Sequence, residues 1–331
     1  MTCDSKGDVS EIPNTQRQPN EKESEQKHFP AESFSSECPS SVSRKSQKFR
    51  PLFLTSTVRS YYARRLLKDL YIIKKNPKKP KTWVRNKAVF PIEDGEHKWV
   101  EEVKLASDVV YTGQLKNGKR DGLGFQEWDH GAKYEGMWKD DKAHGLGKLY
   151  FAKGDIYEGE WEDEVINGFG EYKHVDGAKY IGEWKQDKQH GKGIEVWEGG
   201  SRYEGFYAEG KKNGKGTLLF QDGSVYSGDF KDNFIWGRGN YKWPDGRQYT
   251  GEWRQNKMHG KGKLTWPDGR SYEGDYVNDK KEGEGVFSWP DGRKFRGFWK
   301  HGKQHGKGVY ISPEGEFVER TFKDGKQVET A

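Results

Sequence analysis

The sequence predicts an all-β protein, an elongated single antiparallel sheet of about nine 23-residue hairpin repeats, preceded by a mostly disordered arm with one basic amphipathic helix. Three observations predict this fold. An aromatic residue returns every 23 residues, four glycines travel with it, and the spacing inside each unit has the period of a β-strand. The composition agrees, because 14% of the residues are aromatic although only 31% are hydrophobic. Such a chain is expected to bury rings against bare backbone.

The 23-residue period is strict from residue 111 to residue 317. Glycines follow each leading aromatic residue after two, eleven, thirteen and twenty residues in all nine units, which accounts for 36 of the 43 glycines. The glycine excess therefore indicates architecture and not flexible linkers. The leading aromatic residues are Tyr111, Tyr134, Tyr157, Tyr180, Tyr203, Tyr226, Tyr249, Tyr272 and Phe295.

Each unit is predicted to form one β-hairpin. In the seventh unit, one strand runs from Tyr249 to Trp253, a loop covers residues 254–259, and a return strand covers residues 260–266. A Pro-Asp-Gly turn at residues 267–269 leads into the next unit, since proline fixes φ and glycine permits a tight reversal. One face of the sheet is aromatic, and the opposite face carries charged residues and Thr and is expected to be solvated.

The expected register places rings over glycines. Trp253 is expected to oppose Gly260 within its hairpin, while Gly251 opposes Gly262. Tyr276, the equivalent ring of the next unit, is expected to oppose Gly262 from the other side. Each of these second-position rings would then lie over glycine on both sides, which gives a reason for glycine inside strands that it otherwise weakens.

Two units show a known sequence signature. The segments YEGMW (residues 134–138) with HGLG (144–147), and YTGEW (249–253) with HGKG (259–262), resemble membrane occupation and recognition nexus (MORN) repeats. The resemblance covers residues 111–317 and partly extends to 331. It implies a twisted single antiparallel sheet of successive hairpins, in agreement with the pattern above.

The resemblance also implies a kind of function. MORN repeats occur in radial-spoke and other ciliary proteins and in cytoskeletal cortex proteins, and their common element is a surface that recruits or spaces other molecules. The second-position rings have two interpretations, structural burial against glycine or contacts to a partner helix or peptide, and we expect mainly burial with a few exposed rings. The predicted partner-binding face consists of Trp138, Trp161, Trp184, Tyr207, Phe230, Trp253, Tyr276 and Trp299.

No residue pattern predicts catalysis, a metal site or a cofactor. His144, His190, His259 and His305 precede Gly-x-Gly pairs, but they are 46, 69 and 46 residues apart. Two repeats correspond to four strands, about 19 Å, so neighbours could not share a zinc ion. The Gly-x-Gly pairs lack a phosphate-loop ending and begin no helix. We therefore expect a non-enzymatic protein with histidines as loop residues.

The composition limits the cellular locations and the classes of partner that we expect for this protein. No run of 18 apolar residues is present, and residues 1–15 lack the apolar stretch of a secretory signal, so we expect a cytoplasmic protein. Cys3 and Cys38 are too few for a disulfide framework or zinc site, and lipidation of Cys3 stays open. No nucleic-acid partner is expected, and self-association is open.

The sequence predicts five segments. Residues 1–56 form a disordered polar tail, and residues 57–87 contain the basic amphipathic helix followed by a Lys/Pro linker. Residues 88–110 form an N-terminal cap on the first edge strand. Residues 111–317 form the nine-repeat array, and residues 318–331 form a partial tenth repeat or C-terminal cap.

The basic arm concentrates the charge. Residues 44–87 hold fifteen Lys and Arg against one acid, giving +14 in a protein of net charge +6, so the rest carries −8. The arm could dock in a partner's groove, lie on an anionic membrane or lie on an acidic polymer such as a microtubule. Its predicted binding residues are Arg59, Arg64, Arg65, Lys68, Lys74, Lys75, Lys78, Lys79 and Lys81.

The leading functional hypothesis is a non-enzymatic scaffold that binds partner proteins along its sheet in a cytoskeletal assembly, most specifically a ciliary axoneme. The basic arm would anchor it. The alternative is a peripheral membrane adaptor that binds anionic phosphoinositides through residues 58–87. A third hypothesis is recruitment of an enzyme in trans.

Overall fold

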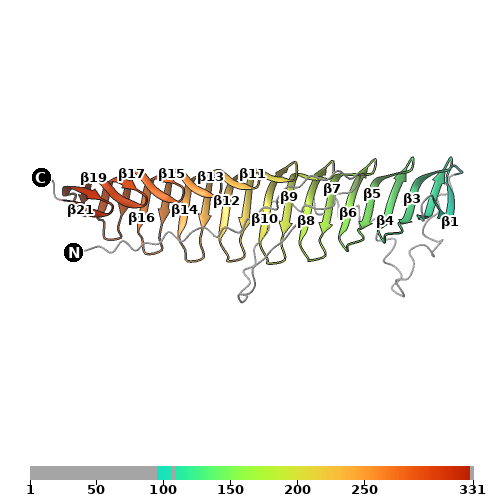
Figure 1. The fold of residues 1–331 in the computed structure, drawn as a ribbon, viewed down its shortest axis with the longest axis horizontal. Helices are drawn as coiled ribbons and strands as arrows, with labels where there is room; N and C mark the ends of the chain where they lie inside the picture. The colour runs from blue at the N-terminus through green and yellow to red at the C-terminus, as the bar shows by residue number, and fades with distance from the viewer. Residues whose placement is uncertain (1–94, 106–108, 329–331) are drawn as a thin grey trace. The chain divides into compact units, whose positions relative to one another are not determined.

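A computed structural model describes residues 95–105 and 109–328, and every regular element in these two ranges is a β-strand (Figure 1). The strands pair with antiparallel neighbours, so the predicted all-β class and antiparallel hairpin architecture are confirmed. Within the same ranges, no helix has the length and apolar character that crossing a membrane would require. The chain divides into two compact units between Ala152 and Lys153.

The described part of the first unit contains five strands. Each strand from β1 to β4 pairs with the one that follows it. Strand β1 lies in the segment predicted as a cap and pairs along β2, from Lys98 opposite Leu115 to Lys104 opposite Val110. The strands are β1 (Lys98–Lys104), β2 (Val110–Lys116), β3 (Lys119–Glu127), β4 (Lys133–Lys139) and β5 (Lys142–Tyr150).

The second unit repeats the same hairpin from β6 onward. A seven-residue strand alternates with a nine-residue strand, up to the short last pair. The strands are β6 (Ile156–Glu162), β7 (Val165–Lys173), β8 (Lys179–Lys185), β9 (Lys188–Val196), β10 (Arg202–Ala208), β11 (Lys211–Leu219), β12 (Val225–Lys231), β13 (Phe234–Lys242), β14 (Gln248–Arg254), β15 (Lys257–Thr265), β16 (Ser271–Val277), β17 (Lys280–Ser288), β18 (Lys294–Lys300), β19 (Lys303–Ile311), β20 (Phe317–Lys323) and β21 (Lys326–Val328).

Each hairpin closes through a two-residue turn, shorter than the sequence predicts. Gln255 and Asn256 connect β14 to β15 with φ angles of 50° and 64°. Two consecutive positive φ angles are typical of a type I′ turn, whose twist matches that of the flanking strands. Residues 257–259, predicted as loop, therefore belong to the return strand, and the predicted loop at 254–259 is wrong.

The register within the hairpin is partly as expected. Gly251 opposes Gly262 as predicted, but Trp253 opposes Met258 and not Gly260. Between these two pairs, β14 contributes one residue and β15 contributes three, so the longer strand accommodates two extra residues in a bulge. Gly260 lies in the bulge with φ +64°, a conformation that favours glycine.

The bulge also changes the pairing to the next hairpin. Tyr276 opposes Gly260, whereas Gly262 opposes Gly274, so the predicted pairing of Tyr276 with Gly262 is wrong. The ring over the glycine pair is the leading tyrosine, because a Cβ added at Gly262 would collide with the Tyr249 ring. The glycines therefore make room for the first ring of each repeat and not for the second.

The turns that join successive hairpins have the predicted chemistry. Gly269 donates its N–H to the carbonyl of Trp266 at 3.0 Å and has φ +89°. Trp266 in turn donates its N–H to the carbonyl of Arg270 at 2.9 Å. The Pro-Asp-Gly sequence thus closes a tight reversal, and equivalent bonds recur at Trp243, Trp289 and Ser312.

A backbone clamp fastens most of the hairpin turns to the preceding hairpin of the same compact unit. Asn256 donates its N–H to the Ile235 carbonyl at 3.1 Å, and its Oδ1 accepts the Ile235 N–H at 2.7 Å. Asp187, Asn233 and Asp279 make the same two bonds to residues 21 positions earlier. Gly210 and Gly302 keep only the backbone bond. The clamps fix the spacing of neighbouring hairpins.

Candidate protein-interaction surface

The aromatic face of the sheet is a column of edge-to-face rings. Trp253 contacts Tyr249 of its own repeat at a centroid distance of 5.1 Å and an interplanar angle of 88°. It also contacts Tyr226 of the preceding repeat at 5.5 Å and 81°. The same pair of contacts recurs from repeat to repeat, and edge-to-face pairs contribute about 0.5 to 1.5 kcal/mol each beyond burial.

The rings predicted as a partner-binding face are the core of the sheet. Their exposed fractions run from 1% at Tyr276 to 8% at Trp299. The eight second-position rings are therefore buried against the leading tyrosines, and none of the eight is exposed. The eight residues are Trp138, Trp161, Trp184, Tyr207, Phe230, Trp253, Tyr276 and Trp299.

The leading tyrosines also hold the bulge in place. Tyr249 Oη donates to the Glu252 carbonyl at 3.0 Å, and seven other leading tyrosines make the same bond three residues along, from Tyr111 to Tyr272. Burial raises the pKa of Tyr249 well above its ordinary value, and the Glu252 charge acts in the same direction. The hydroxyl therefore stays protonated and works as a structural donor.

One buried ion pair interrupts the aromatic face. The Lys212 ammonium lies 2.7 Å from Oε2 of Glu195, with 11% and 9% of the two side chains exposed. Tyr207 Oη donates to the same oxygen at 2.9 Å. The ammonium also lies 4.6 Å from the centroid of Trp197. Two donors and one carboxylate satisfy each other inside the aromatic layer.

A second lysine lies in the aromatic face without such a carboxylate. The Lys281 ammonium is 4.7 Å from the centroids of both Phe287 and Trp299, 5.0 Å from Tyr272 and 5.4 Å from Trp266. Burial first, and the nearby Arg270 charge second, lower the pKa of Lys281 to about 8. The aromatic faces compensate this cation only in part.

The polar face carries apolar side chains at one repeat position. Three residues after the leading aromatic, six of the nine repeats have a carboxylate or amide. In four of these six it accepts a backbone N–H of the bulge, as Glu160 does from Phe169 at 3.0 Å. Met137, Phe206 and Phe298 replace it and are 39%, 42% and 48% exposed. These three repeats give up a local hydrogen bond for an exposed apolar group.

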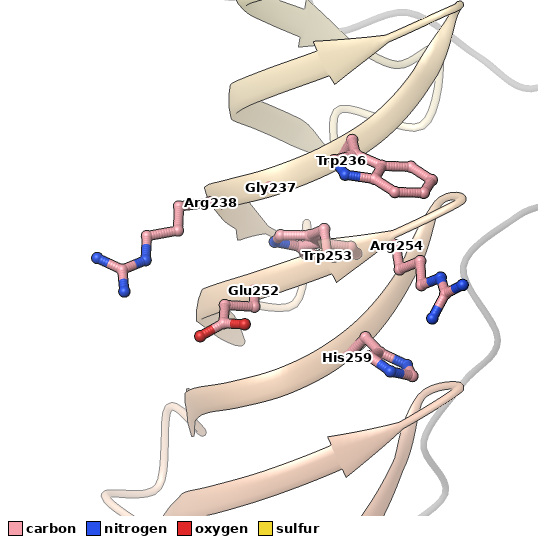
Figure 2. A pocket seen from close by; sticks show the side chains of 7 residues that line it. All are labelled: Trp236, Gly237, Arg238, Glu252, Trp253, Arg254 and His259. Carbon is pink, nitrogen blue, oxygen red and sulfur yellow. The ribbon is translucent and has the colours of Figure 1, made fainter.

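A hollow with mixed chemistry opens beside strands β13, β14 and β15. It is lined by Trp236, Gly237, Arg238, Glu252, Trp253, Arg254 and His259. Figure 2 shows Arg238 and Glu252 on one side of Trp253, and Trp236, Arg254 and His259 on the other. Lys231 lies 5.3 Å from the Trp236 centroid, so this aromatic surface is flanked by cations. The arrangement suits a peptide with apolar and acidic groups.

The described histidines are not gathered into a metal centre. Within residues 95–105 and 109–328, no group of three or more His, Cys, Asp and Glu side chains could hold a metal ion. His259 lines the hollow of Figure 2, and its Nδ1 is buried without a hydrogen-bond partner among the described residues. His305 Nδ1 instead lies 3.4 Å from Oδ1 of Asp324.

The predicted basic arm lies outside the described residues. The structure therefore gives no placement for the predicted tail at 1–56 or the helix and linker at 57–87. The arm residues concerned are Arg59, Arg64, Arg65, Lys68, Lys74, Lys75, Lys78, Lys79 and Lys81.

Antiparallel hairpins of 23 residues, clamped to one another around a ring column, define a β-hairpin repeat protein. The chain belongs to the MORN repeat family, because the family's repeat matches nine segments that together cover more than half of the chain. MORN repeats are a non-enzymatic repeat family and act as protein-interaction scaffolds. The matched segments are 111–132, 134–156, 157–179, 180–202, 203–225, 226–246, 249–269, 272–292 and 295–317.

Comparison with other proteins adds distant likenesses. No curated protein matches the chain significantly. The chain is similar to the TCP10 domain of Danio rerio CPAP in complex with a STIL peptide, at 12% identity over 61% of this chain and 96% of that chain, with a TM-score of 0.35. It is also similar to virginiamycin B lyase from Staphylococcus aureus, at 9% identity over 68% and 84%, with a TM-score of 0.14. Both TM-scores are below 0.5, so neither protein's partner or reaction is carried over.

Sequence reasoning missed the exceptional residues of this surface. Lys212 and Lys281 occupy a repeat position that elsewhere holds residues such as Ile235 and Met258, and this departure was a visible signal. Trp236 likewise occupies a position that is histidine in four repeats. A comparison of the repeats position by position identifies these residues. The 23-residue period by itself does not identify them.

Proposed function

We propose that the protein is a non-catalytic scaffold that binds partner proteins along its sheet within a cytoskeletal assembly. The cilium or flagellum axoneme is the proposed location, and the basic arm at 57–87 is the proposed anchor. Membership of the MORN family supports the scaffold. The axonemal location rests on the family resemblance and on the uninterrupted array, together with the charge of +14 on residues 44–87, which suits acidic polymers.

The observation that carries the proposal is a rigid core beneath a varied surface. Ring contacts and turn clamps repeat with nearly constant geometry, while the polar face changes chemistry from repeat to repeat. A surface fixed in this way loses little conformational entropy when a partner binds. Exposed Phe206 and Phe298 and the hollow at Trp236 are the positions where apolar contact to a partner is available.

Native co-purification tests this proposal. We expect a tagged full-length chain to recover axonemal or other cytoskeletal proteins, and the double variant F206E/F298E to recover fewer of them by about fivefold. Glutamate is compatible with this repeat position because Glu160 and Glu183 occupy it in other repeats. The matched control T250E adds a carboxylate to the same face at a position that is Glu158 in another repeat.

Two results would count against the scaffold. One is absence of the tagged chain from every axonemal or cortical fraction. The other is equal recovery of partners by the double variant and by T250E, which would place binding elsewhere. Recovery of a kinase or methyltransferase in the same purification would instead support recruitment of an enzyme.

The charge of the arm favours one alternative, a peripheral membrane adaptor. Residues 58–87 would bind anionic phosphoinositides, with roughly 1 kcal/mol for each basic residue near the surface. Liposome sedimentation distinguishes the two functions. Strong binding to anionic vesicles that disappears when Lys74, Lys75, Lys78, Lys79 and Lys81 become Glu supports the adaptor, and no binding excludes it.

A further inference from the structure

Two repeats place a lysine at the same position of the aromatic face. Lys212 and Lys281 each follow the leading tyrosine of their repeat by nine residues and are 69 residues apart, which is three repeats. Both ammonium groups lie within 6 Å of several aromatic centroids. The two sites therefore share a geometry and can be compared residue by residue.

The site at Lys212 is complete. Glu195 lies in the preceding repeat, and its Oε2 accepts from the Lys212 ammonium at 2.7 Å and from Tyr207 Oη at 2.9 Å. The carboxylate thus satisfies both donors of the site at once. A buried cation with a carboxylate at this distance is compensated, because charge-assisted hydrogen bonds offset much of its desolvation.

The site at Lys281 lacks the acceptor. Leu264 occupies the position equivalent to Glu195, and it is 2% exposed. Tyr276, the equivalent of Tyr207, is 1% exposed, and its hydroxyl has no hydrogen-bond partner within the part of the chain that the structure describes. Among the described residues, no carboxylate forms an ion pair with Lys281. In the first site, the lysine ammonium and the tyrosine hydroxyl share one carboxylate. In the second site, the equivalent ammonium and hydroxyl have no carboxylate among the described residues.

A third cation lies at the edge of the Lys281 site. The Arg270 guanidinium lies 5.6 Å from the centroid of Trp266, the ring that also borders Lys281. Arg270 is paired to Asp268, with Nε 2.7 Å from Oδ2, on an exposed turn. Asp268 balances the Arg270 charge, so the unbalanced charge of this site is the Lys281 ammonium, which attracts an acidic group from outside.

We propose that Lys281 is the docking point for an acidic side chain of a partner protein. The partner's Asp or Glu carboxylate supplies to the Lys281 ammonium the counter-charge that Glu195 supplies to Lys212. This inference rests on the scaffold function proposed above and specifies the chemistry of one contact. A carboxylate flanked by apolar residues fits best, because Trp266 and Trp299 border the ammonium.

The chain itself provides variants that the fold accepts. K281M introduces the residue found at the equivalent position, Met258, which is fully buried. L264E introduces a carboxylate at the position equivalent to Glu195. This carboxylate should form an internal ion pair with the Lys281 ammonium, as Glu195 does with Lys212. K280M removes the same charge from the adjacent, exposed lysine and is the matched control.

Acylation of lysine side chains provides a local test in the full chain. The protein is treated with a water-soluble acetylating ester, with or without a ten-residue peptide of alternating Glu and Ser, and modification is quantified by mass spectrometry. We expect the peptide to slow acylation of Lys281 by more than about tenfold, the effect of one hydrogen bond to a charged group, and that of Lys280 by less than about twofold. An alternating Gln and Ser peptide should have no effect. In L264E, Lys281 should react slowly without any peptide.

The proposal is overturned if both peptides change acylation of Lys281 equally, or if Lys281 does not react at all, since a closed site cannot accept a partner. A second measurement separates this inference from the scaffold function. Native partners lost by both K281M and L264E but retained by K280M support docking at Lys281. Partners retained by all three variants overturn the inference and leave the scaffold function standing.

Discussion

At the scale of single residues, the sheet depends on the absence of two side chains in each repeat. The leading ring lies over a pair of opposed glycines, such as Gly251 and Gly262 beneath Tyr249. The Tyr249 hydroxyl then reaches the carbonyl of Glu252 at the bulge. A methyl group at either glycine would displace the ring and break both features together.

The first residue-scale prediction concerns Gly262. We expect G262A to lower the free energy of unfolding by about 1 to 3 kcal/mol, because its Cβ would overlap the Tyr249 ring and force the ring to move. G118A is the matched control, since Gly118 has open space around its Cβ position but a positive φ of 78°. Urea unfolding followed by tryptophan fluorescence measures both variants. An equal or larger loss in G118A would contradict the packing argument.

The second residue-scale prediction concerns pH. Burial first, and Arg270 second, lower the pKa of Lys281 from 10.5 to about 8. The unfolded chain therefore binds more protons than the folded chain between these values, so the free energy of unfolding rises as pH increases through this range. From pH 7 to about pH 9.5, the rise attributable to Lys281 is about 2 kcal/mol.

The variant K281M separates the contribution of Lys281 to the pH dependence of unfolding from the contributions of other titrating groups. The difference in unfolding free energy between wild type and K281M should shrink as pH rises over this range, with K281M the more stable protein at pH 7. L264E should also lose the pH dependence, because the introduced carboxylate pairs with the ammonium. A difference that stays constant with pH would contradict the uncompensated charge.

At the scale of elements, the hairpin is defined by its turn and by the clamp to its neighbour. The type I′ turn at Gln255 and Asn256 sets a two-residue connection, and the bulge follows from joining seven- and nine-residue strands. The clamp then connects Asn256 to Ile235 by two hydrogen bonds. Neighbouring hairpins are therefore held at their turn ends as well as along their strands.

The element-scale prediction is that N256G weakens one clamp while preserving the turn. Glycine occupies this position at Gly210 and Gly302, where only the backbone bond remains, so the variant should lose about 1 kcal/mol locally. Hydrogen exchange at the Ile235 amide should become about fivefold faster. Asn278 is a turn residue that makes no clamp bond among the described residues, so N278G should leave this amide unchanged. Equal protection of Ile235 in N256G and wild type would contradict the clamp.

The period of rings and glycines determines most of the fold but not its pairing details. Gly251 opposite Gly262 follows from counting residues, and this pair was predicted. Trp253 opposite Met258 was not, because the turn at Gln255 lacks the Asn-Gly or Asp-Gly pair that indicates a two-residue connection. Lys281 was also missed, because its missing counter-charge becomes visible only when Leu264 and Glu195 are aligned across strands.

At the scale of the whole molecule, stability is a sum of repeats and their interfaces. Within each of the two compact units, a hairpin contacts its neighbours in chain order, so a local change is felt mainly by adjacent repeats of that unit. A regular core of this kind leaves recognition to departures from the repeat pattern. Lys281, Trp236 and the exposed Phe206 and Phe298 are such departures, and they give different repeats different surface chemistry.

Hydrogen exchange of the tagged protein bound to its native partner tests this account most directly. We expect the partner to slow exchange in strands next to the departures from the repeat pattern, such as β13 to β17 around Trp236 and Lys281, and to leave repeats of regular pattern unchanged. Uniform slowing along all repeats, or slowing confined to the arm at residues 57–87, would contradict it.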